Sequence, residues 1–134
     1  MCAYQNLSPV LIGNSLGGIF LAKYLSENRL PHKATSVILV APPFDDSAST
    51  EELSGGFELG DDLPMIFENT ETLYMLFSAD DEVVPPVHAQ KYHQALPAAK
   101  VVVLEGKNGH FRVPELPELL HIIESGAFTV EPPV

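Results

Sequence analysis

Residues 8–20 read SPVLIGNSLGGIF and join two patterns that belong to different secondary structures. The first part, residues 8–12, is short, apolar and β-branched and stops at a glycine, which predicts a strand buried on both faces. Over residues 16–28 apolar side chains recur at spacings of three to four, which predicts a helix. The turn GNSLG, residues 13–17, therefore lies between a strand and a helix.

The same alternation continues along the chain. Further apolar runs predict strands, and amphipathic stretches predict helices; the strands are at residues 36–41, 72–78 and 100–105, and the helices at 86–95 and 115–125. Strands of the buried type that alternate with helices predict the α/β class, with a mostly parallel sheet of about four strands flanked by helices.

The chain of 134 residues has the size of one domain, and its 46% hydrophobic and 19% charged residues are typical of a globular protein. We therefore expect residues 1–134 to form a single domain. Residues 44–62, rich in Asp, Ser, Thr, Gly and Glu, are expected to be a surface excursion. Residues 127–134 are expected to be a frayed tail.

The charge of the chain bears on its partners, and its single cysteine bears on its compartment. The formal net charge of −11 argues against binding to nucleic acid or to an anionic membrane, because both need a basic face. No apolar run approaches the ~20 residues that span a bilayer. A single cysteine, Cys2, cannot form an internal disulfide, so we expect a cytoplasmic protein.

The turn at residues 13–17 is the motif G-x-S-x-G in the strand-to-helix context of a nucleophile elbow. The glycines at 13 and 17 are expected to omit side chains that would collide in so sharp a turn. The N–H of Leu16, at the start of the helix, would face a developing oxyanion. Alone, the motif also fits a glycine-rich turn in which Ser15 merely caps the helix.

A nucleophilic serine needs a base, and the base needs a group that orients it. Asp81 follows the third predicted strand in SADDEVVP, residues 78–85, and His110 follows the fourth in GKNGHF, residues 106–111. Both would lie at the carboxyl edge of a parallel sheet, beside the serine. The alternatives are a solvated acidic turn and an ordinary loop histidine.

The chain resembles the α/β-hydrolases, and more narrowly the small serine hydrolases related to retinoblastoma-binding protein 9. The resemblance rests on four motifs: GNSLGG at 13–18, LSGGF at 53–57, DDEVVP at 80–85 and GHF at 109–111. It implies that Ser15 is the nucleophile, His110 the base and Asp81 the triad acid. Asp81 is preferred over Asp80 because the family's aspartate stands four residues before a proline, here Pro85.

The chain departs from that family at its front, where the family has strands before the elbow. We expect that the N-terminal part of the fold is missing, and with it the loop that donates the second oxyanion N–H. The elbow strand would then be an exposed sheet edge through which the chain self-associates. The isolated chain is expected to hydrolyse esters only slowly.

The predicted function is that of a serine hydrolase acting on small carboxylic esters, or on amides or thioesters, through an acyl-enzyme. No cofactor is expected. A metal site is not expected either, because His88 and His93 are five residues apart and do not form the pair of the motif H-E-x-x-H. The alternative is a non-catalytic remnant or interaction module that keeps the scaffold.

Overall fold

The structure is a computed structural model that describes residues 9–45 and 58–125. Strands and helices alternate along the chain, with one additional 3-10 helix, η2. The elements are β1 (Val10–Asn14), α1 (Leu16–Glu27), β2 (Ala34–Val40), η2 (Leu63–Glu68), β3 (Thr70–Ser78), α2 (Val87–Ala95), β4 (Lys100–Leu104) and α3 (Pro117–Ser125). The expected tail at 127–134 lies outside the described residues, as does most of the excursion expected at 44–62.

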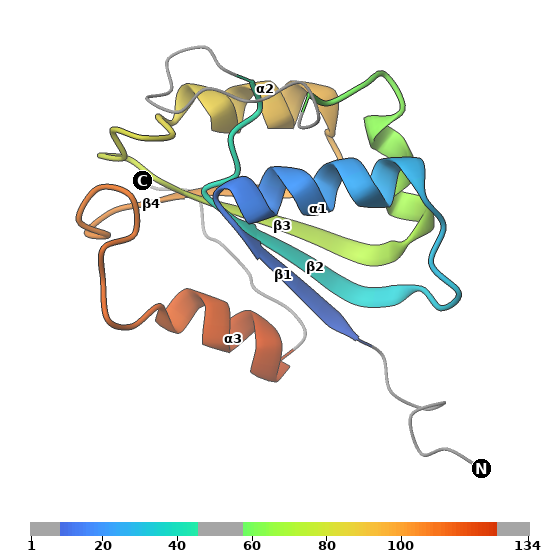
Figure 1. The fold of residues 1–134 in the computed structure, drawn as a ribbon. Helices are drawn as coiled ribbons and strands as arrows, with labels where there is room; N and C mark the ends of the chain where they lie inside the picture. Colours follow the sequence, from blue (N-terminus) through green and yellow to red (C-terminus); the bar gives the residue numbers. More distant parts are fainter. Residues whose placement is uncertain (1–8, 46–57, 126–134) are drawn as a thin grey trace.

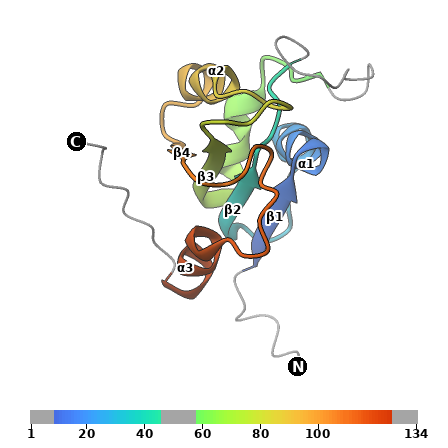
Figure 2. The ribbon, with the colours of Figure 1, turned by 90° about the vertical axis from the view of Figure 1, so that its left-hand side faces the viewer.

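All four strands are parallel and pair in the order β1-β2-β3-β4. The predicted α/β class with a parallel four-stranded sheet flanked by helices is therefore confirmed. Helices α1 and α2 cover one face of the sheet and α3 covers the other (Figures 1 and 2). Because the strands run in parallel, their carboxyl ends all lie at one edge, where the loops that follow them can meet.

The core has two layers, one on each side of the sheet. Alternate residues of the central strands supply each layer, as the period of two in a strand requires. In β3, Met75 and Phe77 pack under α1 and α2, whereas Tyr74 and Leu76 pack against α3. Strands β2 and β3 are buried on both faces, because each has a strand on either side and helices above and below.

The structure differs from the sequence predictions in two elements. The first strand is not buried on both faces: Ile12 is 47% exposed, because β1 is the edge of the described sheet. Helix η2 was not predicted, since a six-residue 3-10 helix is too short to show a helical period. Within residues 9–45 and 58–125, no helix has the length and apolar character that a bilayer crossing requires.

Candidate active site

Ser15 occupies the sharp turn between β1 and α1. Its backbone has φ 53° and ψ −120°, outside the conformations that a non-glycine residue normally adopts. The turn is held by the Ser15 N–H, which donates to the Val40 carbonyl at 2.8 Å. The Ser15 side chain makes no cap hydrogen bond to α1. The alternative of a simple helix-capping serine therefore does not describe this turn.

Glycines around Ser15 allow β1, α1 and the segment after β2 to approach closely. A Cβ atom at Gly13 would lie 2.7 Å from the Gly17 carbonyl oxygen, and one at Gly18 would lie 2.9 Å from Cβ of Pro42. At Gly17, by contrast, no described atom lies within 4 Å of that position. The expectation that Gly17 avoids a collision was wrong, and Gly18 has that role in the described structure.

His110 lies on the loop that connects β4 to α3. The backbone takes positive φ at four positions in this short loop, which are Gly106, Asn108, Gly109 and Phe111. The loop folds tightly on itself, and the Phe111 N–H donates to the Gly109 carbonyl at 2.8 Å. The tight loop brings His110 back to the carboxyl edge of the sheet. There its side chain is only 19% exposed.

Asp81 lies in the turn that follows β3, and its side chain is fully buried. One carboxylate oxygen, Oδ1, accepts from the backbone N–H groups of Val83 and Val84, both at 2.8 Å. These two bonds close the turn and fix the carboxylate. The other oxygen, Oδ2, lies 2.7 Å from Nδ1 of His110.

The three side chains form a continuous series of contacts. His110 Nε2 lies 3.0 Å from Ser15 Oγ on one side of the ring, and Asp81 Oδ2 lies at Nδ1 on the other. The structure thus brings together the three residues that were singled out along the sequence, from three different strand ends. Leu16 opens α1, so its N–H is among the first four N–H groups, which have no partner inside a helix.

Asp80 has a different environment from Asp81. Its carboxylate accepts a hydrogen bond from the Ser78 hydroxyl at 2.6 Å. This bond, with a backbone hydrogen bond from Gly109, holds the pKa of Asp80 below its ordinary value of 3.8. Asp81, not Asp80, is the aspartate in contact with the histidine.

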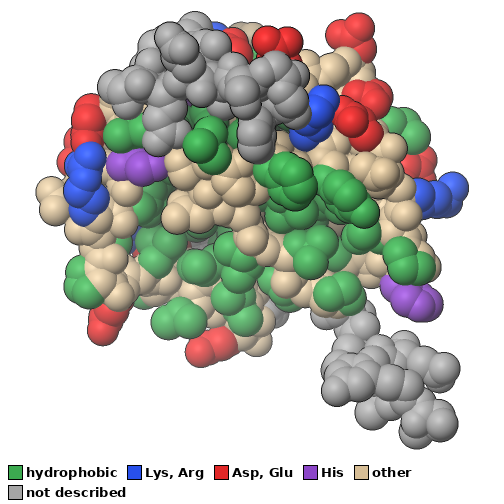
Figure 3. Space-filling view, in the orientation of Figure 1, with side chains coloured by type: hydrophobic (Ala, Val, Ile, Leu, Met, Phe, Trp, Pro, Cys, Tyr) green, Lys and Arg blue, Asp and Glu red, His purple; other side chains and the backbone are tan. Residues whose placement is uncertain are grey.

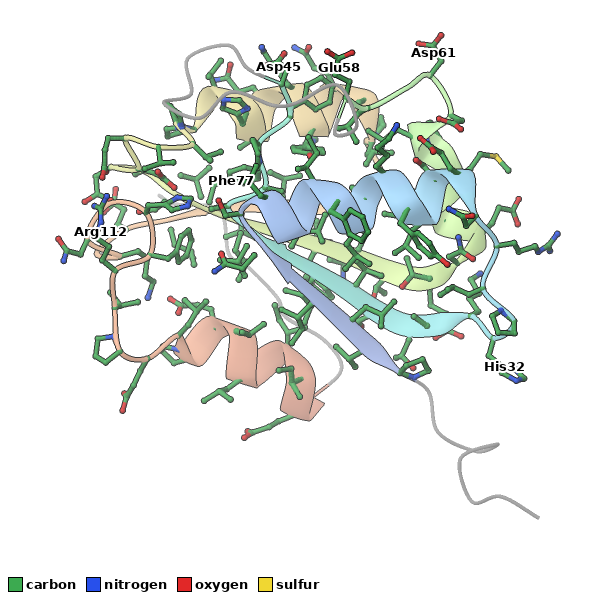
Figure 4. The ribbon with its side chains drawn as sticks, viewed as in Figure 1. His32, Asp45, Glu58, Asp61, Phe77 and Arg112 are labelled. Atoms are coloured by element: carbon green, nitrogen blue, oxygen red, sulfur yellow. The ribbon has the colours of Figure 1, made fainter. Side chains whose placement is uncertain are left out.

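Ion pairs hold the His110 loop on both sides, and sequence reasoning missed them. Arg112 donates to Glu82 in the turn after β3, and the two loops lie side by side at this end of the molecule (Figure 4). This hydrogen bond lowers the pKa of Glu82 and raises that of Arg112. Lys107 Nζ lies 3.0 Å from the Glu118 carboxylate on α3. Lys107 and Glu118 are 11 residues apart in the sequence, and Arg112 and Glu82 are 30 apart. Neither separation matches a helix or strand period, so no pattern in the sequence pairs them.

A groove of about 240 Å³ opens between β1 and the segment that leads into α3. Ile12 and Asn14 line it from β1, and Phe111, Leu116 and Leu119 line it from the other side. Among the described residues, no group of three or more His, Cys, Asp or Glu side chains is arranged to hold a metal ion.

The chain belongs to the serine hydrolase family. The family model described as "Serine hydrolase" matches residues 3–116, which include the elbow, the Asp81 turn and the His110 loop. A search of curated proteins found no match.

Several solved structures share the fold. The ydeN gene product of B. subtilis superposes with a TM-score of 0.72 at 23% identity, over 87% of this chain and 63% of that one. The carboxylesterase Cest-2923 of Lactobacillus plantarum WCFS1 gives 0.60 at 20% identity, over 91% and 60%. The monoacylglycerol lipase of Paleococcus ferrophilus gives 0.56 at 19% identity, over 89% and 67%. The chain therefore spans 60 to 67% of the length of these proteins and has an α/β-hydrolase fold.

Proposed function

We propose that this protein is a serine hydrolase that cleaves small carboxylic esters, or amides or thioesters, through a Ser15–His110–Asp81 triad. The observation that carries the proposal is the unbroken series of contacts from Ser15 Oγ through the His110 ring to the buried Asp81 carboxylate, at 3.0 and 2.7 Å. These are the contacts that a nucleophile, its general base and the group that orients the base require.

In the proposed first step, His110 Nε2 takes the proton of Ser15 while Oγ attacks the carbonyl carbon of the ester. The Asp81 carboxylate holds the ring through Nδ1 and stabilises the imidazolium that forms. The N–H of Leu16 at the head of α1 donates to the oxyanion. His110 then protonates the leaving alcohol, and a water molecule activated by the same ring hydrolyses the acyl-enzyme.

Three further points belong to the proposal. We propose that the chain is related to the serine hydrolases of the retinoblastoma-binding protein 9 group, which its motifs at residues 13–18, 53–57, 80–85 and 109–111 resemble. With one cysteine it needs no oxidising compartment, so we propose a cytoplasmic location. The alternative of a non-catalytic module is not favoured, because the family model is that of serine hydrolases and the structural neighbours include a carboxylesterase and a monoacylglycerol lipase.

A fluorophosphonate probe tests this function without knowledge of the natural substrate. The probe phosphonylates only an activated serine, and we expect a single adduct on the peptide that contains Ser15. Ser15→Ala should abolish the adduct, and His110→Ala should slow its formation by several orders of magnitude. A folded protein that stays unlabelled would favour the non-catalytic alternative.

A further inference from the structure

The loop that carries His110 has a strained backbone. Asn108 and Phe111 take φ of 52° and 53°, in the left-handed region that residues other than glycine rarely adopt. Such conformations cost energy and persist only where the surrounding structure holds them. The contact with Asp81 is made by the His110 side chain and does not itself fix the backbone of the loop. This backbone therefore needs contacts from other segments.

The carboxylate before Asp81 supplies one such contact. Asp80 accepts a hydrogen bond from the N–H of Gly109, one residue before His110. The buried hydroxyl of Ser78, at the end of β3, donates to the same carboxylate at 2.6 Å and so orients it. The backbone of the loop is thus joined to the turn that also holds the triad acid.

The carboxylate after Asp81 supplies a second contact. Glu82 accepts from Arg112, two residues after His110. The pair closes over Gly109, where a Cβ atom would lie 2.5 Å from Oε2 of Glu82 and would also collide with the guanidinium. Figure 3 shows acidic, basic and histidine side chains together at this end of the molecule, at the left of the view. The pair therefore rests directly on the backbone that precedes the base.

We propose that Asp80 and Glu82 are positioning residues, which together keep the His110 ring aligned with the other two triad members. Three successive carboxylates then hold one loop: the first by its backbone, the second by the imidazole and the third by the arginine. Either outer contact alone keeps the loop close, whereas losing both frees its backbone from this turn. A displacement of ~1 Å in an active site can lower a rate by about 10². The assignment rests on the proposed triad mechanism.

Two double variants separate these contacts from the effect of charge. In Asp80→Ala/Glu82→Ala neither side chain can accept a hydrogen bond, whereas Asp80→Asn/Glu82→Gln loses the same two charges and keeps an acceptor oxygen at each position. The alanine pair should react with the fluorophosphonate about 10² times more slowly than wild type, and the amide pair within about tenfold of it. Each single alanine variant should lose only about threefold. Both side chains are exposed, so all variants should melt within about 4 °C of wild type.

A matched pair of glycine variants opens the Glu82–Arg112 contact without changing either residue. Gly109 and Gly106 have nearly the same φ, 76° and 74°, so alanine strains both positions alike. At Gly109 the new methyl group would push the ends of the two side chains apart, whereas at Gly106 no described atom lies within 4 Å. In the Asp80→Ala background, Gly109→Ala should reproduce the loss of about 10², and Gly106→Ala should not. Equal effects of the two alanines would contradict a role for the pair.

A proton spectrum reports the alignment without any turnover. In the proposed triad the His110 Nδ1–H donates to the buried Asp81 carboxylate, and a short hydrogen bond to a charged group moves the proton resonance downfield of the amide protons. We expect this resonance in wild type and in the amide pair, and its loss in the alanine pair. If wild type is not labelled, the proposed function fails, and the resonance alone decides whether the two carboxylates position the ring.

Two results would overturn the proposal. Equal losses of rate and of the resonance in both double variants would show that only the charges matter. An alanine pair that is labelled as fast as wild type and keeps the resonance would show that neither carboxylate positions the ring.

Discussion

Ser15 and His110 face each other from two segments that are held in different ways. The serine turn is shaped by backbone crowding: the glycines at 13 and 18 let chain segments approach to distances that exclude a Cβ atom. The His110 loop is held mainly by side chains, through the Glu82–Arg112 and Lys107–Glu118 ion pairs and the contact with Asp81.

This difference predicts how the two segments respond to substitution. Chain segments in close contact at Gly13 and Gly18 cannot move apart easily, so a methyl group added at either glycine should displace Ser15. The Glu82–Arg112 pair is exposed and contributes little to stability, so its main effect is on orientation and on the local field. Changes near the serine should therefore lower stability and activity together, whereas changes around the histidine should alter activity and leave the fold intact.

The largest effect on activity is expected at the two catalytic side chains, Ser15 and His110. Ser15→Ala should abolish fluorophosphonate labelling. Ser15→Ala and His110→Ala should each lower ester hydrolysis by several orders of magnitude, and the double variant should hydrolyse the ester no more slowly than either. Circular dichroism should show an unchanged fold. Losses that multiply in the double variant would mean that the two groups do not act as a unit.

The next largest effect distinguishes two neighbouring carboxylates. Asp81→Asn removes the charge that contacts His110 Nδ1 and should lower the labelling rate by ~10³ to 10⁴. Asp80→Asn changes a carboxylate that bonds to Ser78 and should lower the rate less than about tenfold. Equal losses at the two positions would contradict the assignment of Asp81.

Adding a methyl group to a glycine tests the role of backbone crowding. Gly18→Ala should destabilise the protein by about 1 to 3 kcal/mol and slow labelling, because the new Cβ would press on Pro42. Gly17→Ala, one residue earlier on the same helix, should be neutral or stabilise by up to about 1 kcal/mol, since described atoms leave the position open. Chemical denaturation measures both. A destabilised Gly17→Ala would show that another part of the protein packs there.

A smaller effect is expected from the Glu82–Arg112 pair. Both Glu82→Gln and Arg112→Gln break the ion pair that joins the turn after β3 to the His110 loop. Each should lower the rate of fluorophosphonate labelling by less than about tenfold, because an exposed pair contributes little energy. An unchanged rate in both variants would mean that the pair does not help to position His110.

The smallest effect concerns stability in acid. Because Arg112 lowers the pKa of Glu82, the stabilisation from this pair is present above the ordinary value of 4.5 and is lost as the pH falls through the lowered folded value. Wild type and Glu82→Gln should therefore differ slightly in melting temperature at pH 6 and converge below pH 4. A gap that widened in acid would contradict the direction of the shift.

Several features of the fold could be predicted from local sequence patterns. Buried strands such as β2 and β3 are continuous apolar runs, and the parallel α/β class follows from their alternation with helices. The order of Ser15, Asp81 and His110 after successive strands could also be predicted, since parallel strands bring their carboxyl ends to one edge. These features depend on the period and order of residues, which the chain carries locally.

Other features were decided only by the tertiary structure. The crowding at Gly18 depends on Pro42, which comes from a different strand end. The pairs of Arg112 with Glu82 and of Lys107 with Glu118 join residues whose separation has no period. A sequence specifies which side chains are available, but distances between segments that are remote in the chain are set by how the sheet and helices pack.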